Sequence, residues 1–357
     1  MAMPETQTMY FAEDNLKSFC KQMFLKSGLP ETDATLVSHI IVETEMRDVS
    51  SHGLVRVPFY CRRLIAKGTN PNPKLSMVVD RPSVLLIDGD NGMGQVVGAH
   101  AMTQAIQKAK ATGICFAGVR NSGHFGMAST YAMLASRQEM IGVSSTNTTP
   151  LMTAWGGSGK AIGNNPLAVA VPTGGKFPLV LDISMSMVAG GKVRLASTNK
   201  EKIPLDWLLD AQGRPTDNPD DFSRGGTLLP MGGHKGYGLA VILEILTGVI
   251  TGANILGEIG LWIKDPAAPV NFGHFFIAID VSALCDVEEF KNRINKLIGK
   301  MKSSPISEGS KGIFVPGEIE YLQEQAGRKH GIPISLDVVA EANDFALQIG
   351  IPPLKKH

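Results

Sequence analysis

Short apolar strands, each followed at once by a polar or glycine-rich turn, constrain the fold of this chain more than any other feature. Residues 84–88, 114–119 and 140–145 are such strands, and helical periodicity follows the turns after the first two. A strand, a glycine-rich turn and a helix in succession are typical of an open α/β sheet, in which functional residues lie in such turns. We therefore expect an α/β protein.

Length and composition favour a folded protein that acts on small partners. The 357 residues exceed one average domain, and 43% hydrophobic against 19% charged residues is enough apolar material for a large core. The net charge of +1, with acids and bases interspersed, leaves no basic patch for nucleic acid or a membrane surface. We therefore expect no nucleic-acid partner and no membrane partner.

Cysteine spacing and the N-terminal sequence favour a cytoplasmic protein. Cys20, Cys61, Cys115 and Cys285 are far apart and form no CxxC pair, which argues against a zinc cluster and against a disulfide framework. The N-terminus has no basic segment followed by an apolar core, and no apolar run reaches the roughly 18 residues that span a bilayer. We therefore predict a cytoplasmic protein with neither a leader nor a membrane span.

Helical periodicity divides the chain into an N-terminal lobe and a core. A proline-rich loop at 70–73 marks the boundary between them. We predict a helical lobe over 1–75, joined by C-terminal helices within 325–357, and a sheet core over 76–324. The apolar residues of the lobe recur at helical spacing over 12–25, 31–48 and 54–66.

Three further patterns in the core give more local expectations. Residues 192–226 are polar and rich in turn residues, which predicts an extended surface excursion. Residues 313–319 form a short apolar run that contains a Pro-Gly pair, which predicts a strand leading into a turn. His274 lies within the strand predicted over 271–280, and we expect it to be structural.

The segment over 49–57 places hydroxyls, an imidazole and a guanidinium close together. Ser50, Ser51, His52 and Arg56 all lie within it. A histidine in a polar turn can reach a reacting proton, and an arginine four positions later on a helix lies on the same face. The segment thus pairs an acid/base group with an anion-binding group. An ordinary helix start, with a hydroxyl cap and a surface arginine, remains the alternative.

His124 is a second catalytic candidate, and Asp182 is a candidate to support it. His124 stands in the turn over 120–126, directly after a buried strand, with a glycine on either side. Asp182 ends a later apolar strand, where a carboxylate suits the orientation of an imidazole or a cofactor ribose. Capping of the next helix by Asp182 is the alternative.

Two glycine-rich turns are similar to nucleotide-binding motifs without matching them. Residues 89–98 lie between a strand and a helix, but Val97 replaces the third small residue of the dinucleotide fingerprint, and no acidic residue ends a second strand. We therefore reject a Rossmann site there. The turn over 232–236 opens an apolar helix and contains Lys235, which favours an anion at the helix start, although its spacing is not that of a P-loop.

Eight motifs in order make the chain resemble the type-2 malate/L-lactate dehydrogenase family over almost its whole length. That family includes ureidoglycolate and sulfolactate dehydrogenases, diketogulonate reductase, and reductases of piperideine- and pyrroline-2-carboxylate. Each motif is weak alone, and the ordered set is specific. Two positions depart from the family pattern, since Asn164 stands where threonine is usual and Thr148 where serine is common. The motifs are SSHGLVRV (50–57), GMGQVV (92–97), RNSGHFG (120–126), TNTTP (146–150), GNNPLAVAVP (163–172), LDISMS (181–186), GGHKGYGL (232–239) and VPGE (315–318).

The resemblance implies a three-layer α/β/α fold with a mixed sheet, unrelated to the Rossmann fold, in a homodimer with sites near the interface. It implies a cofactor-binding core and reversible hydride transfer between NAD or NADP and a small 2-hydroxy or 2-oxo acid. His52, beside Ser51, is similar to the family's general acid/base, Arg56 to a carboxylate clamp, and His124 to a proton-transferring histidine of some members. The positions that match cofactor contacts are Thr148, Asp182, Ile183, Ser184, Ser186, His234, Lys235, Pro316, Gly317 and Glu318.

The sequence leaves three functions open. In a malate- or lactate-like 2-hydroxy-acid dehydrogenase, a histidine with a pKa of about 6.5 serves as acid in reduction and as base in oxidation. A reductase of cyclic imine acids shares every motif. A metal hydrolase or non-catalytic binding module is disfavoured, because the histidines form no HxxxH or HExxH pair. The substrate, the nicotinamide type, the leading histidine and the oligomer size stay open.

Overall fold

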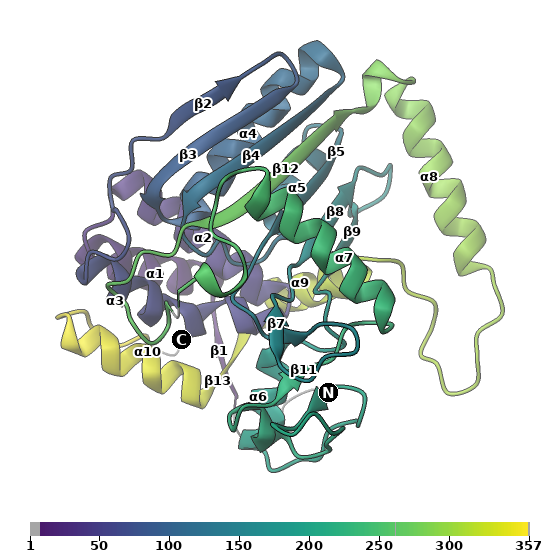
Figure 1. Ribbon diagram of the computed structural model, residues 1–357. Coiled ribbons are helices and arrows are strands. Elements are labelled where there is room, and N and C mark those ends of the chain that lie inside the picture. The colour runs from purple at the N-terminus through teal and green to yellow at the C-terminus, as the bar shows by residue number, and fades with distance from the viewer. Residues whose placement is uncertain (1–7, 261, 356–357) are drawn as a thin grey trace.

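A seven-stranded mixed sheet lies at the centre of the computed structural model, which describes residues 8–260 and 262–355 (Figure 1). The strand order is β2-β3-β4-β12-β5-β8-β9, in which β3 and β4 are parallel and all other neighbours are antiparallel. The strands are β2 (Ser76–Asp80), β3 (Val84–Gly92), β4 (Ile114–Ser122), β5 (Met140–Thr146), β8 (Leu167–Val171), β9 (Leu179–Ile183) and β12 (Phe272–Asp280).

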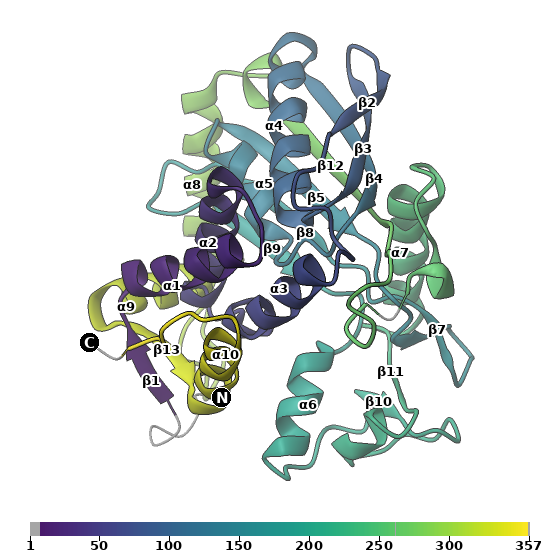
Figure 2. The same cartoon turned by 90° about the vertical axis from the view of Figure 1, so that its left-hand side faces the viewer.

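Helices cover both faces of this sheet. Phe276 of β12 packs among residues of α4 and α5, whereas its neighbour Phe275 packs against residues of α7 on the opposite face, as the alternation of side chains along a strand requires. Figure 2 shows α4 and α5 on one side of the sheet and α7 on the other. The predicted three-layer α/β/α fold with a mixed sheet is therefore confirmed. These helices are α4 (Gly94–Thr112), α5 (Ser129–Ser136) and α7 (His234–Glu244), which continues into the π-helix η5 (Ile245–Val249).

Four strand ends meet at one edge of the sheet. Strands β3 and β4 are parallel, β4 and β5 are both antiparallel to β12, and β5 and β9 are both antiparallel to β8. All four therefore run in the same direction, and their C-terminal residues Gly92, Ser122, Thr146 and Ile183 lie along the same edge. The motif-bearing turns that follow them are thus brought into one row.

Helices from both ends of the chain pack together next to this edge. One apolar cluster contains Phe24, Ile41 and Leu64 from the N-terminal helices together with Ile332 and Phe345 near the C-terminus. This packing supports the predicted lobe of residues 1–75 and 325–357, of which 1–7 and 356–357 lie outside the described residues; the domain division itself stays a prediction. The elements are β1 (Thr8–Phe11), α1 (Glu13–Lys26), α2 (Glu31–Met46), α3 (Val57–Ile65), α9 (Glu318–His330), β13 (Ile332–Ser335) and α10 (Leu336–Gln348), with β1 paired to β13.

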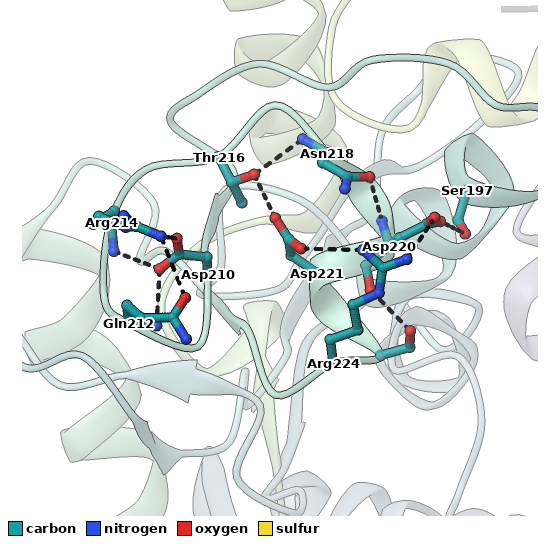
Figure 3. Close-up of polar contacts among 10 residues, drawn as sticks. Ser197, Asp210, Gln212, Arg214, Thr216, Asn218, Asp220, Asp221 and Arg224 are labelled. Carbon is teal, nitrogen blue, oxygen red and sulfur yellow. Dashed lines mark hydrogen bonds and ion pairs between the residues drawn. The ribbon is translucent and has the colours of Figure 1, made fainter.

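Residues 192–226 are more ordered than the sequence predicts. Helix α6 covers the first part of this segment, and carboxylates hold the loops that follow, as Asp221 accepts a hydrogen bond from Thr216 at 2.6 Å and Asp220 one from Ser197 at 2.5 Å (Figure 3). The polar, turn-rich pattern therefore did not reveal helix α6 or the short strands of this excursion. The elements are β6 (Met152–Thr153), β7 (Lys160–Ile162), α6 (Gly190–Thr198), β10 (Leu208–Leu209), η4 (Pro219–Phe222) and β11 (Thr227–Leu228), and the short strands form a sheet in the order β10-β11-β6-β7.

The strand predicted over 313–319 is wrong. Residues 313–317 have no regular structure, and α9 begins at Glu318. Val180 of β9 donates its backbone N–H to Pro316 O at 3.0 Å, but no ladder forms around that single bond. Further elements are the 3-10 helices η6 (Leu256–Glu258) and η7 (Val281–Ala283) and the helix α8 (Val287–Lys302). In the described part of the chain, no helix has the length and apolarity to cross a bilayer.

Gly142 tests the contact between the sheet and α5. A Cβ atom at this position would lie 2.2 Å from the backbone oxygen of Ala132. We expect Gly142→Ala to reduce the free energy of unfolding by about 1–3 kcal/mol through overpacking, measured by urea denaturation. In the control, Gly159→Ala, the added methyl meets nothing within 4 Å, and a change below about 0.5 kcal/mol is expected. Equal effects of the two substitutions would contradict this account.

Candidate active site

The turn after α2 carries the first group of predicted site residues. It consists of two short 3-10 helices, η2 (Ser50–His52) and η3 (Leu54–Arg56), which lead into α3. Ser51 Oγ lies 2.9 Å from His52 Nδ1, and Arg56 Nε donates to Ser51 O at 2.7 Å. No hydroxyl of the turn caps a helix, and Arg56 is partly buried. The alternative of an ordinary helix start with a surface arginine is therefore wrong.

His124 meets this turn from the end of β4. Its ring stacks on the ring of His52, with centroids 5.5 Å apart and an interplanar angle of 15°. Tyr60, one helical turn after Arg56, places its hydroxyl 2.7 Å from His124 Nδ1. A Cβ atom at Gly94 would lie 2.3 Å from Gly123 O, so a glycine there lets α4 approach this turn. The fold thus brings together the two histidines that the sequence singled out.

An aromatic wall of Trp262 and Phe272, which the sequence did not reveal, lies against His124. The Trp262 ring stacks on His124 at 5.0 Å and lies 6.0 Å from the Arg56 guanidinium, and the edge of Phe272 meets His124 at 6.1 Å. Tyr60 could have been identified from the sequence as a neighbour of the site, since it lies four residues after Arg56 on an expected helix. Trp262 could not have been identified from local sequence, because the long loop before β12 brings it to the site.

Burial and neighbouring positive charge keep both imidazoles neutral. Burial, with the Arg56 charge as the second cause, lowers the pKa of His52 from 6.5 to about 3. The pKa of His124 is held well below its ordinary value, first by burial and then by His52, Arg56 and His274. A neutral imidazole beside a guanidinium can accept a proton from a hydroxyl whose substrate carries a carboxylate.

A second group of predicted residues follows β5. Thr148 Oγ1 lies 3.1 Å from Asn164 Oδ1 and accepts a hydrogen bond from Asn164 N at 3.1 Å. Thr148 N donates to Asn165 Oδ1, also at 3.1 Å. The two positions that depart from the family pattern therefore contact each other directly.

A ladder of backbone hydrogen bonds connects this group to the turn at the start of α7. Met185 N donates to Asn164 O, and Met231 N donates to Met185 O, both at 2.8 Å. Ser184 and Ser186, on either side of Met185, have hydroxyls 3.2 Å apart. His234 and Lys235 form the exposed first turn of α7, where no side chain of the cap residue bonds the helix. Such a free helix start attracts anions.

Asp182 and the segment 316–318 have structural roles beside this group. Asp182 Oδ2 accepts the Ser129 N–H at 2.8 Å and so caps the start of α5. Within the described part of the chain, Asp182 contacts no imidazole, and the helix that it caps precedes it in the chain; its role toward a cofactor ribose stays a prediction. The side chain of Glu318 accepts the Val315 N–H at 3.0 Å and fixes the start of α9. Ile183 is the last residue of β9.

The loop after β9 leads from the second group toward the turn of residues 50–56. A Cβ atom at Gly191, in the first turn of α6, would lie 3.1 Å from Ser51 Cβ. The segment that carries Ser184 and Ser186 therefore leads into a helix whose first turn lies against Ser51. Among residues 8–260 and 262–355, no group of three histidine, cysteine, aspartate or glutamate residues could hold a metal ion.

Comparison with known proteins assigns the family. A sequence model described as Malate/L-lactate dehydrogenase matches residues 11–343. The chain belongs to this family. It is 37% identical over 354 residues to the malate dehydrogenase of Pyrococcus abyssi, covering 96% of each. It is 37% identical over 346 residues to the L-sulfolactate dehydrogenase of Methanocaldococcus jannaschii, covering 96% of this chain and 98% of the relative. The predicted family and the prediction of a dehydrogenase are confirmed.

Solved structures and more distant relatives widen this picture. The malate dehydrogenase structure from Pyrococcus horikoshii has a TM-score of 0.91 at 36% identity, covering 99% of each chain. A delta1-piperideine-2-carboxylate reductase from Pseudomonas syringae has a TM-score of 0.83 at 25% identity, covering 94% of this chain and 99% of the other. The names of two relatives include a cofactor. Ureidoglycolate dehydrogenase (NAD(+)) of Escherichia coli is 29% identical, covering 92% of this chain and 94% of the relative. (2R)-3-sulfolactate dehydrogenase (NADP(+)) of Chromohalobacter salexigens is 32% identical, covering 90% of this chain and 93% of the relative.

His274 makes the stability of this region depend on pH. It is fully buried, with Nδ1 2.8 Å from Thr146 Oγ1, and burial lowers its pKa to about 3. The folded pKa lies below the unfolded value of about 6.5, so stability is lost as pH falls below 6.5. We expect His274 to contribute about 2 kcal/mol to the loss of unfolding free energy between pH 8 and pH 5.

Urea denaturation of His274→Gln at both pH values measures this contribution. The variant should lose less stability than the wild type between pH 8 and pH 5. His330→Gln, at an exposed position, serves as the control and should follow the wild type. The account fails if the His274 variant has the same pH dependence as the wild type.

Proposed function

We propose that the protein is an oxidoreductase that transfers hydride between NAD(P)(H) and a small 2-hydroxy or 2-oxo acid of the malate or lactate kind. The observation that carries this proposal is the His52–His124 pair, stacked at 5.5 Å beside Arg56 within an aromatic wall. Family membership and relatives named as malate and sulfolactate dehydrogenases support the reaction class.

Arg56 and His52 have different roles toward the substrate. The guanidinium binds the carboxylate and so orients the 2-carbon. In oxidation, the neutral imidazole of His52 takes the hydroxyl proton, and in reduction the protonated ring returns it to the developing alkoxide. The Arg56 charge is the second cause of the low His52 pKa. A carboxylate bound at Arg56 offsets that charge and raises the pKa toward the working range.

The row of strand ends suits a dinucleotide beside the histidines. Thr148, Ser184 and Ser186 offer hydroxyls, and His234 and Lys235 stand at the free start of α7, where the helix dipole and the lysine favour a phosphate. The nicotinamide supplies or accepts the hydride when it is bound. The aromatic wall of Trp262 and Phe272 keeps bulk water from the reacting carbon.

A panel of substrates tests this proposal. Malate, lactate and sulfolactate with NAD+ and NADP+, and the matching 2-oxo acids and cyclic imine acids with NADH and NADPH, are followed by nicotinamide absorbance. The structural likeness to a piperideine-2-carboxylate reductase makes cyclic imine reduction the second candidate. Turnover of the imines without turnover of any hydroxy or oxo acid would reject the first proposal in favour of the second.

His52→Ala distinguishes the two candidate acid/base residues. We expect kcat to fall by about 10²- to 10⁴-fold, while the affinity for NADH or NADPH, measured by fluorescence titration, stays within about twofold because the ring serves chemistry. His39→Ala, an exposed position on α2, is the control. If His52→Ala keeps near wild-type kcat and His124→Ala does not, the acid/base role belongs to His124.

Arg56→Ala tests the carboxylate clamp. Loss of a charge-assisted hydrogen bond predicts a KM for the acid substrate about 10- to 100-fold higher. The matched control is Arg62→Ala on α3, the helix that follows Arg56, because the Arg62 guanidinium instead lies near Glu341 at 3.8 Å. An unchanged KM in the Arg56 variant removes this residue from the clamp.

We also propose a homodimer in a reducing, cytoplasmic compartment. The α7–η5 helix exposes Leu239, Ile242, Val249 and Ile250, and an apolar stripe of this kind favours burial against a second copy. Cys285 is an exposed free thiol, which suits a reducing environment. Sedimentation analysis measures the oligomeric state, and a monomer at micromolar concentration rejects the dimer.

A further inference from the structure

A buried carboxyl lies directly beside the turn of residues 50–56, which carries the proposed catalytic residues. Glu45, in the last turn of α2, is 5% exposed, and its Oε1 accepts the Leu54 N–H at 2.6 Å. Leu54 is the first residue of η3, which carries Arg56 as its third residue. An oxygen that accepts a hydrogen bond from the first free N–H group of a helix acts as its cap.

The same carboxyl also interacts with the chain on the N-terminal side of His52. The Ser50 hydroxyl is a hydrogen-bonding neighbour of Glu45, two residues before His52, and Leu54 lies two residues after it. A Cβ atom at Gly53 would lie 2.1 Å from Glu45 Oε1. The turn closes on the carboxyl this tightly only because position 53 is a glycine.

We propose that Glu45 is a positioning residue for the reaction: its carboxyl accepts the Leu54 N–H after His52, lies beside the Ser50 hydroxyl before it, and so fixes His52 and Arg56 relative to each other. Glu45 does not touch the substrate and acts through the turn. The inference rests on the proposed function for its kinetic readouts, whereas its structural readouts do not need turnover.

The environment of Glu45 makes the strength of its hydrogen bond to the turn depend on pH near neutrality. Burial raises the pKa of Glu45 to about 7, against the lowering effects of the Leu54 N–H and the Ser50 hydroxyl, and Asp48 raises it further. Cys20 of α1 also faces the carboxyl, and Oε2 is buried without a hydrogen-bond partner. The ionised carboxylate forms the stronger bond to Leu54 N–H. The turn is therefore held more firmly as pH rises through 7.

Kinetics of Glu45→Ala and Glu45→Gln test the positioning role. In Glu45→Ala we expect the KM of the acid substrate to rise at least about tenfold and kcat to fall, with nicotinamide affinity unchanged, because only the turn loses its cap. Glu45→Gln keeps an oxygen acceptor and should recover most of both parameters. It should also lack the inflection near pH 7 that we expect in the wild-type profile of acid KM between pH 5.5 and 9.

Two further measurements do not depend on turnover. The His52 ring, assigned in proton NMR spectra by comparison with His52→Ala, should titrate at a higher pH in Glu45→Ala because the loosened turn admits water. Because the Glu45 pKa is raised on folding, its ionisation opposes folding, and stability is lost as pH rises from about 4.5 through about 7. That loss should be smaller in Glu45→Gln.

Glu244 provides a matched control. It is also 5% exposed, and its Oε1 accepts the Leu256 N–H at 2.9 Å at the start of the 3-10 helix η6. It therefore makes the same capping bond away from the turn of residues 50–56, and its Oε2 also accepts a hydrogen bond from Asn165 Nδ2 at 2.7 Å. Glu244→Gln should leave the inflection in acid KM and the His52 titration as in the wild type.

The outcomes separate this inference from the proposed function. A folded Glu45→Ala with wild-type acid KM, kcat and His52 titration overturns it. If Glu45→Ala does not fold, Glu45→Gln and Glu45→Asp decide: an unchanged inflection near pH 7 in Glu45→Gln, or an unchanged acid KM in Glu45→Asp, overturns it. Wild-type protein that turns over no oxo acid or imine refutes the proposed function instead, and the NMR titration then decides the role of Glu45.

Discussion

The helical lobe is packed against the sheet edge, and the chemistry of the site depends on this contact. Met93, Trp262 and Phe272 from the core belong to the same apolar cluster as the N- and C-terminal helices. Trp262 and Phe272 also enclose His124. The burial that stabilises the lobe is therefore the burial that lowers the imidazole pKa values, so a loosening of the lobe changes acid/base behaviour together with stability.

This burial strengthens the effect of the Arg56 charge on the neighbouring histidines. A positive charge in a poorly hydrated site interacts strongly with neighbouring groups, which is why Arg56 contributes to the low pKa of both His52 and His124. In the proposed function, the same charge attracts an acid substrate. Under the proposed function, a carboxylate bound at Arg56 would offset this charge and raise the pKa values of the nearby imidazoles, so that one residue would couple substrate binding to proton transfer.

The sequence predicted those parts of the site that depend on local order. Strands ending in polar turns located His124 and Thr148, and the turn at 49–57 located His52 and Arg56, because residues at a strand end or one helical turn apart are neighbours by geometry. Trp262 and Glu45 were missed because their roles come from tertiary contacts. Helix α6 was missed because it begins with two glycines and buries only Val193 and Ala196, so its apolar periodicity is weak.

The two departures from the family pattern form one unit. Thr148 Oγ1 accepts the Asn164 N–H and can donate its proton to Asn164 Oδ1, each at 3.1 Å. A hydroxyl has a single proton to donate, so a Thr148 hydroxyl bonded in this way meets a dinucleotide chiefly as an acceptor or through its methyl group. Changing either residue alone leaves a partner unpaired. If Thr148 contacts the cofactor as the family resemblance implies, the two residues act on it as a pair.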